Sequence, residues 1–206
     1  MHFLDADSKF MNAWTNLTDA IWINILMTIT SLPIFTIGAS LAAGQTAIRK
    51  LMNSEGHLTK AYFRAFKENF VKATVIWIIF GLAGFVCLYS WVILQISGLL
   101  IPKIALTVVW FIGFEWVFAL QARFENTIGK TISNAYIFGV TYFWGTLAMA
   151  GIDILVAFIV IASWFLLPQG LFLLAILGYG CVLTAHVPIQ EYFFHKGGYL
   201  KKDSER

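Results

Sequence analysis

The sequence is poor in charged residues, and this scarcity excludes an ordinary soluble domain. Charged residues make up 12% of the 206 positions and hydrophobic residues 59%, whereas about 25% of the residues in typical soluble domains are charged. The mean hydropathy is +0.77. This composition is typical of an integral membrane protein. We therefore predict an all-α fold, a polytopic bundle of transmembrane helices.

Cysteine and proline are also scarce, with two and four residues respectively. Cys87 and Cys181 lie in apolar stretches without a CxxC pattern or metal-ligating neighbours, which predicts buried structural thiols. The sequence has no internal repeat, low-complexity tract or linker rich in Pro, Gly and Ser. We therefore expect a single integral membrane domain over residues 1–206.

Enzyme signatures are missing from the chain. It has no GxSxG, P-loop or HExxH motif and no cluster of His and Cys with the spacing of a zinc site. We therefore expect a protein that is not an enzyme, with no catalytic residue, no metal site and no cofactor. The net charge of +3 comes from cations gathered in particular connections, so nucleic acid is not an expected partner.

The first apolar segment, residues 14–48, is too long for one straight crossing. A helix of this length at about 1.5 Å per residue would exceed a hydrocarbon core of about 30 Å. Pro33 predicts a break, and Gly38, Ser40 and Gly44 give the following part small side chains that allow close helix packing. The segment is either one broken span or a re-entrant hairpin with Pro33 at its tip.

Four more apolar stretches follow, which with the first predict about five spans. The predicted spans are residues 14–48 (broken), 73–97, 104–122, 136–166 and 171–189.

Lysine and arginine alternate between the connections of these spans. They number six in residues 49–72, two in 123–134 and four in the C-terminal tail, against one in 98–103 and none in 167–170. The positive-inside rule then predicts a multi-pass protein of the cell membrane with a cytoplasmic C-terminus. The N-terminus is extracellular if the first segment crosses once, and cytoplasmic if that segment is a hairpin.

The connection 49–72 predicts an amphipathic basic helix at the cytoplasmic surface, with Thr59 as its N-cap and Lys60 as its first residue. Cations on this helix and in the next connection can reach anionic headgroups of the bilayer or dock a protein partner. The candidate contacts are Arg64, Lys67, Lys72, Arg123 and Glu125. Ordinary positive-inside anchoring is the alternative interpretation.

Three polar residues inside the predicted spans form a candidate site. Asp153 is costly at membrane depth and should face protein or water. Gly139, Thr146, Ala150 and Ala157 share its helical face, which predicts burial against a neighbouring helix. The positions of Glu115 and His186 in their predicted spans place both in the expected inner half of the membrane. These side chains either relay protons and bind a cation or polar solute, or they are neutral groups that hydrogen-bond across the bundle.

Several sequence blocks resemble the bacterial YesL family. The blocks are LPIFTIGAS (32–40), FRAFKENF (63–70) leading into AT (73–74), ARFENT (122–127) and NA (134–135). The resemblance implies a small multi-spanning protein of unresolved function whose genes often lie near carbohydrate-uptake and two-component sensor genes. We therefore expect a non-enzymatic accessory or regulatory protein that contacts a transporter or sensor. The alternative is a small-solute transporter or channel that uses Asp153, Glu115 and His186.

Overall fold

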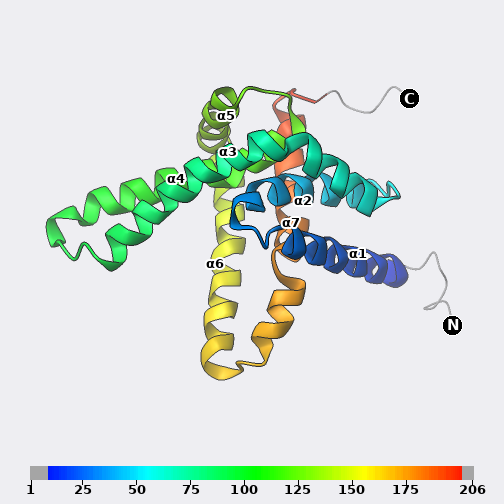
Figure 1. The fold of residues 1–206 in the computed structure, drawn as a ribbon, viewed down its shortest axis with the longest axis horizontal. Coiled ribbons are helices and arrows are strands. Elements are labelled where there is room, and N and C mark those ends of the chain that lie inside the picture. Colours follow the sequence, from blue (N-terminus) through cyan, green and yellow to red (C-terminus); the bar gives the residue numbers. More distant parts are fainter. Residues whose placement is uncertain (1–8, 201–206) are drawn as a thin grey trace.

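The computed structural model describes the backbone of residues 9–200 and the side chains of residues 14–174, 178 and 180–200. The fold is all-α, as predicted, with no β-strand in the described backbone (Figure 1). The elements in chain order are α1 (Lys9–Thr30), the 3₁₀ turn η2 (Ile34–Thr36), α2 (Ile37–Met52), α3 (Leu58–Val92), the 3₁₀ turn η3 (Ser97–Leu99), α4 (Leu100–Arg123), α5 (Ile128–Thr141), α6 (Phe143–Leu166) and α7 (Gly170–Lys196).

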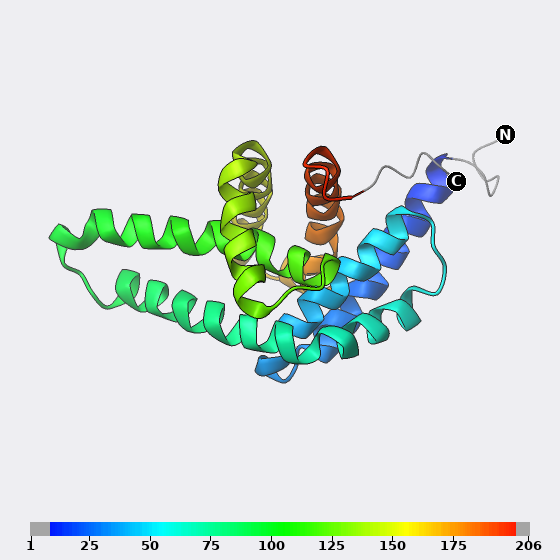
Figure 2. The same cartoon turned by 90° about the horizontal axis from the view of Figure 1, so that it is seen from above.

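The first apolar segment is a helical hairpin with Pro33 in its turn (Figure 2). Ser40 Oγ donates to the carbonyl oxygen of Met27 at 3.0 Å, and a Cβ added at Gly44 would lie 2.5 Å from Met27 Sδ. The predicted break at Pro33 is therefore confirmed, the favoured single crossing is wrong, and the chain turns back at Pro33 as in the hairpin alternative. The chain turns back here because proline ends α1 and because small side chains let α2 lie directly against α1. The start of α1 and the end of α2 consequently lie at the same end of the hairpin.

Helix α2 is the centre of the molecule and packs against α1, α3, α4 and α7. At Gly38 the backbone of α3 is so close that a Cβ would overlap the carbonyl oxygen of Ala73 and lie 2.6 Å from Trp77 Cβ. Small residues thus permit contact between helix backbones. The buried residues of α2 are Gly38, Ala39, Ser40, Leu41, Ala42, Ala43, Gly44, Gln45, Ala47 and Ile48.

A buried group of three hydroxyls joins the first three helices. The Tyr62 hydroxyl lies 2.6 Å from Thr30 Oγ1 and 2.9 Å from Ser40 Oγ. Both Tyr62 and Ser40 are fully buried. A buried hydroxyl without a partner costs about 1–3 kcal/mol, so these mutual hydrogen bonds favour the one arrangement in which α1, α2 and α3 meet here.

Among the described residues, three segments are long and apolar enough to cross a membrane: Leu58–Val92, Ser97–Arg123 and Phe143–Leu166. The prediction of about five spans is therefore not met. Helix α3 is continuous from Leu58, so the predicted surface helix and the second span are one element. Thr59 is not its N-cap, because His57 occupies that position and Thr59 Oγ1 accepts a hydrogen bond from Trp22 Nε1 at 2.9 Å.

The last two predicted spans are also interrupted. Residues 136–166 divide at Tyr142 into α5 and α6. Helix α7 contains the predicted span 171–189 but leaves helical geometry at Gly178 (φ 14°, ψ −136°). Near this kink the buried side chain of Asn24 accepts a hydrogen bond from the backbone amide of Gly180 at 3.0 Å, which satisfies a polar group in apolar surroundings.

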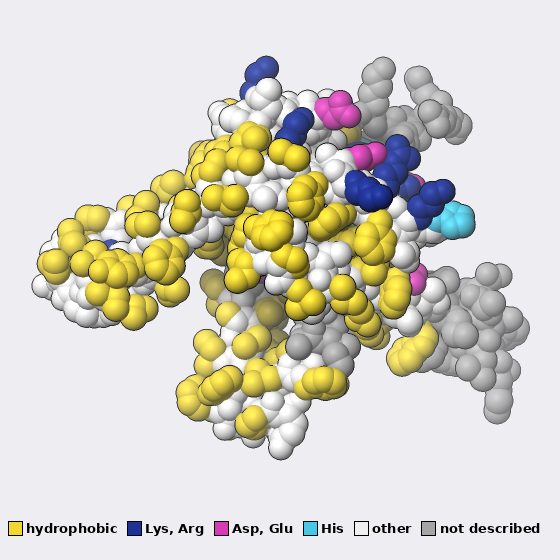
Figure 3. Space-filling view, in the orientation of Figure 1, with side chains coloured by type: hydrophobic (Ala, Val, Ile, Leu, Met, Phe, Trp, Pro, Cys, Tyr) yellow, Lys and Arg dark blue, Asp and Glu magenta, His cyan; other side chains and the backbone are white. Residues whose placement is uncertain are grey.

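Two apolar hairpins project from the centre in different directions (Figure 1). One consists of α3 and α4, and the other of α6 and the first part of α7. Side chains near their ends are exposed, as at Phe85 (65%) and Phe158 (67%). Figure 3 shows apolar side chains covering both projections and most visible Lys and Arg side chains over the remainder. The cation-poor connections 98–103 and 167–170 are thus at the ends of the hairpins.

The contact between α2 and α3 predicts that Gly38→Ala destabilises the protein by about 1–3 kcal/mol, because the Ala73 backbone cannot move aside like a flexible side chain. The measurement is the melting temperature of the purified variant in detergent. Gly151→Ala in α6 is the control, since open space surrounds its added methyl group. An unchanged melting temperature for Gly38→Ala would contradict the close contact.

Candidate functional site

Glu115, Asp153 and His186, named here the polar triad, come together from α4, α6 and α7. Glu115 Oε2 lies 3.6 Å from His186 Nδ1, and Asp153 Oδ1 lies 3.3 Å from His186 Nε2. The side chains of Glu115 and His186 are each 3% exposed, whereas that of Asp153 is 31% exposed. The three residues that sequence reasoning selected therefore form one cluster, which is open on the side of Asp153.

Neighbouring hydrogen bonds fix the helices that carry the triad. Trp116 Nε1 donates to Thr146 Oγ1 at 2.9 Å, and Thr146 Oγ1 donates to the carbonyl oxygen of Gly139 at 2.9 Å. Gln190 Nε2 donates to the backbone oxygen of Glu115 at 2.9 Å, joining α7 to α4. The main chain around Glu115 is thus held from α5, α6 and α7.

The helical face predicted around Asp153 is only partly buried. Thr146 is buried and Ala150 is half-buried, but Ala157 is exposed. Gly139 lies in α5, on the other side of the break at Tyr142. The prediction of one buried face is therefore wrong beyond the first turns of α6, because the rest of this helix belongs to a projecting hairpin.

The triad places one carboxylate beside each nitrogen of a single imidazole. One possible ligand atom from each residue can be chosen so that all three lie within 4.8 Å of one another. An imidazole between two carboxylates can exchange protons with them or join them in binding a cation. The geometry thus fits both functional interpretations that the sequence suggested.

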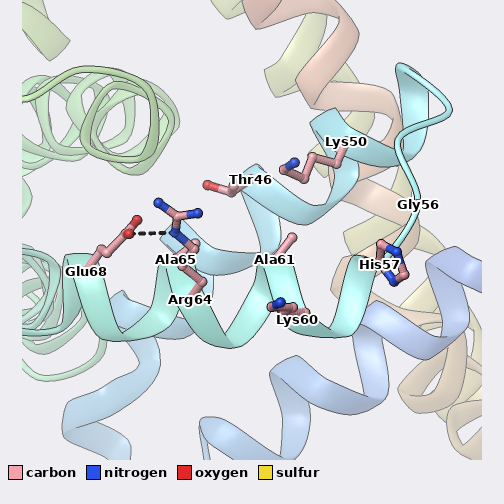
Figure 4. A pocket seen from close by; sticks show the side chains of 9 residues that line it. All are labelled: Thr46, Lys50, Gly56, His57, Lys60, Ala61, Arg64, Ala65 and Glu68. Atoms are coloured by element: carbon pink, nitrogen blue, oxygen red, sulfur yellow. Dashed lines mark hydrogen bonds and ion pairs between the residues drawn. The ribbon is translucent and has the colours of Figure 1, made fainter.

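A second polar region is a cavity of about 350 Å³ between the end of α2 and the start of α3. Its cations are Lys50, Lys60 and Arg64 (Figure 4). Arg64 Nε lies 2.9 Å from Glu68 Oε1, and Lys50 Nζ lies 2.6 Å from Glu55 Oε2. The hydrogen bond from Lys50 lowers the pKa of the Glu55 carboxyl.

A neighbouring cavity of about 580 Å³ also includes Arg64 and Glu68 in its lining. It brings together four of the five predicted partner or lipid contacts: Arg64, Lys72, Arg123 and Glu125. Lys67 is not among the lining residues that the described structure gives for either cavity. We call the cations of both cavities, Lys50, Lys60, Arg64, Lys72 and Arg123, the basic face.

Hydrogen bonds made by residues that line the second cavity hold the basic face together. Lys72 Nζ donates to the carbonyl oxygen of Asn126 at 3.0 Å, which ties α3 to the connection before α5. Gln121 Nε2 donates to Asn69 Oδ1 at 3.0 Å, and Thr131 Oγ1 donates to Gln121 Oε1 at 3.3 Å. These hydrogen bonds therefore join α3, α4 and α5 beside the cavity.

Glu191 was missed by sequence reasoning, although it lies between two arginines. Its Oε1 is 3.4 Å from Arg123 Nε and 3.8 Å from Arg49 Nη1, and all three side chains are mostly buried. Burial, followed by the charge of Arg123, lowers the pKa of Arg49. No short-range motif links positions 49, 123 and 191, so only the packing of α2, α4 and α7 shows this ion cluster.

The ion cluster predicts that Glu191→Gln destabilises the protein by about 1–3 kcal/mol, because two mostly buried arginines lose their shared counterion. Glu68→Gln removes an exposed partner of Arg64 and should cost less than about 1 kcal/mol. Melting temperatures of both variants in the same detergent test this difference. Equal effects would show that Glu191 does not serve as a buried counterion.

Comparison with known proteins gives one family match. Residues 17–91 match the model of a family described as "Protein of unknown function, DUF624". No curated protein and no solved structure matches the chain. The matched segment contains Arg64, Lys67 and Lys72 of the predicted contacts, and the polar triad lies wholly outside it.

Proposed function

We propose that this chain is a non-enzymatic accessory or regulatory protein of the bacterial cell membrane, linked to carbohydrate uptake or sensing. The observation that carries the proposal is the basic face, where two adjoining cavities gather five cations. Lys and Arg side chains bind phosphate and carboxylate groups strongly, and basic residues beside a membrane attract anionic headgroups. The basic face thus suits anionic lipid and an acidic surface of a transporter or sensor.

The carbohydrate link rests on the resemblance to the YesL family. The segment 17–91 that matches the family of unknown function includes the blocks at residues 32–40, 63–70 and 73–74. Residues 32–40 contain Pro33 and form the turn of the α1–α2 hairpin and the first turn of α2. The resemblance therefore falls on the segment that builds the centre of the fold and part of the basic face.

The hairpin changes the proposed sidedness of the N-terminus. The start of α1 lies at the same end of the hairpin as the connection after α2 (Figure 2), and this connection adjoins the first cavity of the basic face. We therefore assign the start of α1 and the basic face to the cytoplasm, and the connection 167–170 to the outer side.

Cysteine labelling tests this sidedness in a background without Cys87 and Cys181. Cysteines placed at Asn16 and His57 should resist a membrane-impermeant reagent added to intact cells, whereas one at Gln169 should react. All three should react after the membrane is opened. Labelling of position 57 in intact cells would overturn the assignment of the basic face to the cytoplasm.

The basic face predicts that the double variant Lys60→Gln, Arg64→Gln binds phosphatidylglycerol about 30-fold more weakly than the parent. Each cation near an anionic surface contributes about 1 kcal/mol, so two should contribute about 2 kcal/mol. The measurement is titration of the purified protein in nanodiscs of increasing phosphatidylglycerol content. Lys130→Gln is the control, because this exposed cation lies outside the linings of both cavities. Equal phosphatidylglycerol binding by the parent and the double variant would exclude a role for this face. In a separate purification, the double variant should also lose a carbohydrate permease or sensor kinase that co-purifies with the parent.

The convergence of the polar triad favours a second candidate, a small-solute transporter or channel. Intramembrane ionisable residues often mark solute or proton pathways, and Asp153 leaves the triad open on one side. The same purified protein in liposomes separates the two candidates. An accessory protein shows no solute flux alone, whereas a transporter shows flux that Asp153→Asn abolishes.

A further inference from the structure

We propose that the polar triad binds one divalent transition-metal ion, with Zn²⁺ as the simplest representative. Glu115, Asp153 and His186 would each supply one ligand atom. The proposal is independent of the accessory function, because a metal can bind here whether or not the basic face binds lipid or protein.

The distances within the triad are close to those of a metal site. Zinc bonds to nitrogen and oxygen are about 2.0–2.2 Å long, so the ligand atoms of a tetrahedral site lie about 3.5 Å apart. One atom from each residue already lies within 4.8 Å of the other two. Binding of the ion would therefore require these atoms to approach one another by about 1 Å.

One imidazole nitrogen of this cluster is buried without a hydrogen bond. His186 is 2% exposed, and its Nε2 has no hydrogen-bond partner in the described part of the chain. Asp153 Oδ1 nevertheless lies 3.3 Å from this nitrogen. A buried imidazole nitrogen without a hydrogen bond is costly, and coordination of a metal ion would satisfy it.

Charge balance also favours a divalent cation. Once both carboxyl groups are ionised as metal ligands, they carry two negative charges beside a neutral imidazole, and burial of unpaired charge is strongly unfavourable. Glu115 is almost completely buried and Asp153 is two-thirds buried. A dication neutralises the pair where few water molecules can.

The imidazole among the three donors favours a transition-metal ion. Imidazole nitrogen suits zinc and its neighbours in the first transition row, whereas Mg²⁺ and Ca²⁺ prefer sites made of oxygen ligands. Three protein ligands leave a coordination position for water or a solute, and the exposed side of Asp153 provides access to it.

Surrounding contacts join the helices that carry the ligands. Gln190 lies one turn beyond His186 on α7 and donates to the backbone of Glu115. Trp116, the neighbour of Glu115, donates to Thr146 of α6, the helix that also carries Asp153. Such outer hydrogen bonds commonly fix metal ligands in position, and here they join all three helices of the triad.

The test is metal binding by the purified full-length protein in detergent. After chelation and dialysis, titration with Zn²⁺ should give one ion per chain and raise the melting temperature, while Mg²⁺ at the same concentration should do neither. Co²⁺ should give the visible absorption of a site with nitrogen and oxygen ligands. Asp153→Asn and His186→Asn should each weaken Zn²⁺ binding at least about tenfold.

His195→Asn is the matched control, because this exposed histidine lies on the same helix outside the triad. It should bind Zn²⁺ like the parent. Circular dichroism and gel filtration identify variants that fail to fold, and Glu115→Gln gives an independent ligand variant. Failure of the folded parent to bind Zn²⁺, or equal binding by the parent and Asp153→Asn, would overturn the site. Neither result bears on lipid binding at the basic face, so the two proposals fail separately.

Discussion

The close approach of helix backbones around α2 is the constraint on which the rest of the structure depends. Gly38 brings α2 against the Ala73 carbonyl of α3, and Gly44 brings it against Met27 of α1. Larger residues at these positions would separate the helices. They would also disrupt the hydrogen bonds among the hydroxyls of Thr30, Ser40 and Tyr62. Because lipid tails are as apolar as the helices, packing and interhelical hydrogen bonds must hold such a core together. Small side chains on α2 therefore determine how closely α1 and α3 pack at the centre.

From this centre the chain separates its polar groups into two regions. The basic face lies around the end of α2 and the start of α3 and continues to the end of α4. The polar triad lies where α4, α6 and α7 meet. Helix α4 links them, since it carries Glu115 of the triad and Arg123 of the basic face. Glu191 on α7 is an ion-pair partner of Arg123, and His186 lies just over one turn earlier. Helices α4 and α7 thus each carry residues of both the polar triad and the ion cluster around Glu191.

The sequence located the candidate polar residues better than it located the helix ends. Asp153, Glu115 and His186 stood out because charge and imidazole are costly in an apolar segment, and the structure brings them together. Glu191 and Arg49 did not stand out, because both fall in stretches where polar residues are common.

The ends of two helices were predicted wrongly because the local sequence does not mark them. Residues 60–72 are amphipathic and residues 73–92 are apolar, yet one continuous helix contains both. The break at Tyr142 has neither proline nor glycine at its position to announce it.

What the sequence alone determined is the apolar character and the helical content: few charges and long apolar stretches favour helices, since a helix pairs its backbone polar groups internally. It also determined the break at Pro33, because proline has no amide hydrogen and blocks the preceding turn. Only the tertiary structure decided that the chain turns back there, through contacts of Ser40 and Gly44 with Met27. It alone decided that residues 115, 153 and 186 share a site. Their convergence depends on the crossing of three helices, and a crossing is fixed by packing between distant segments that no local pattern encodes.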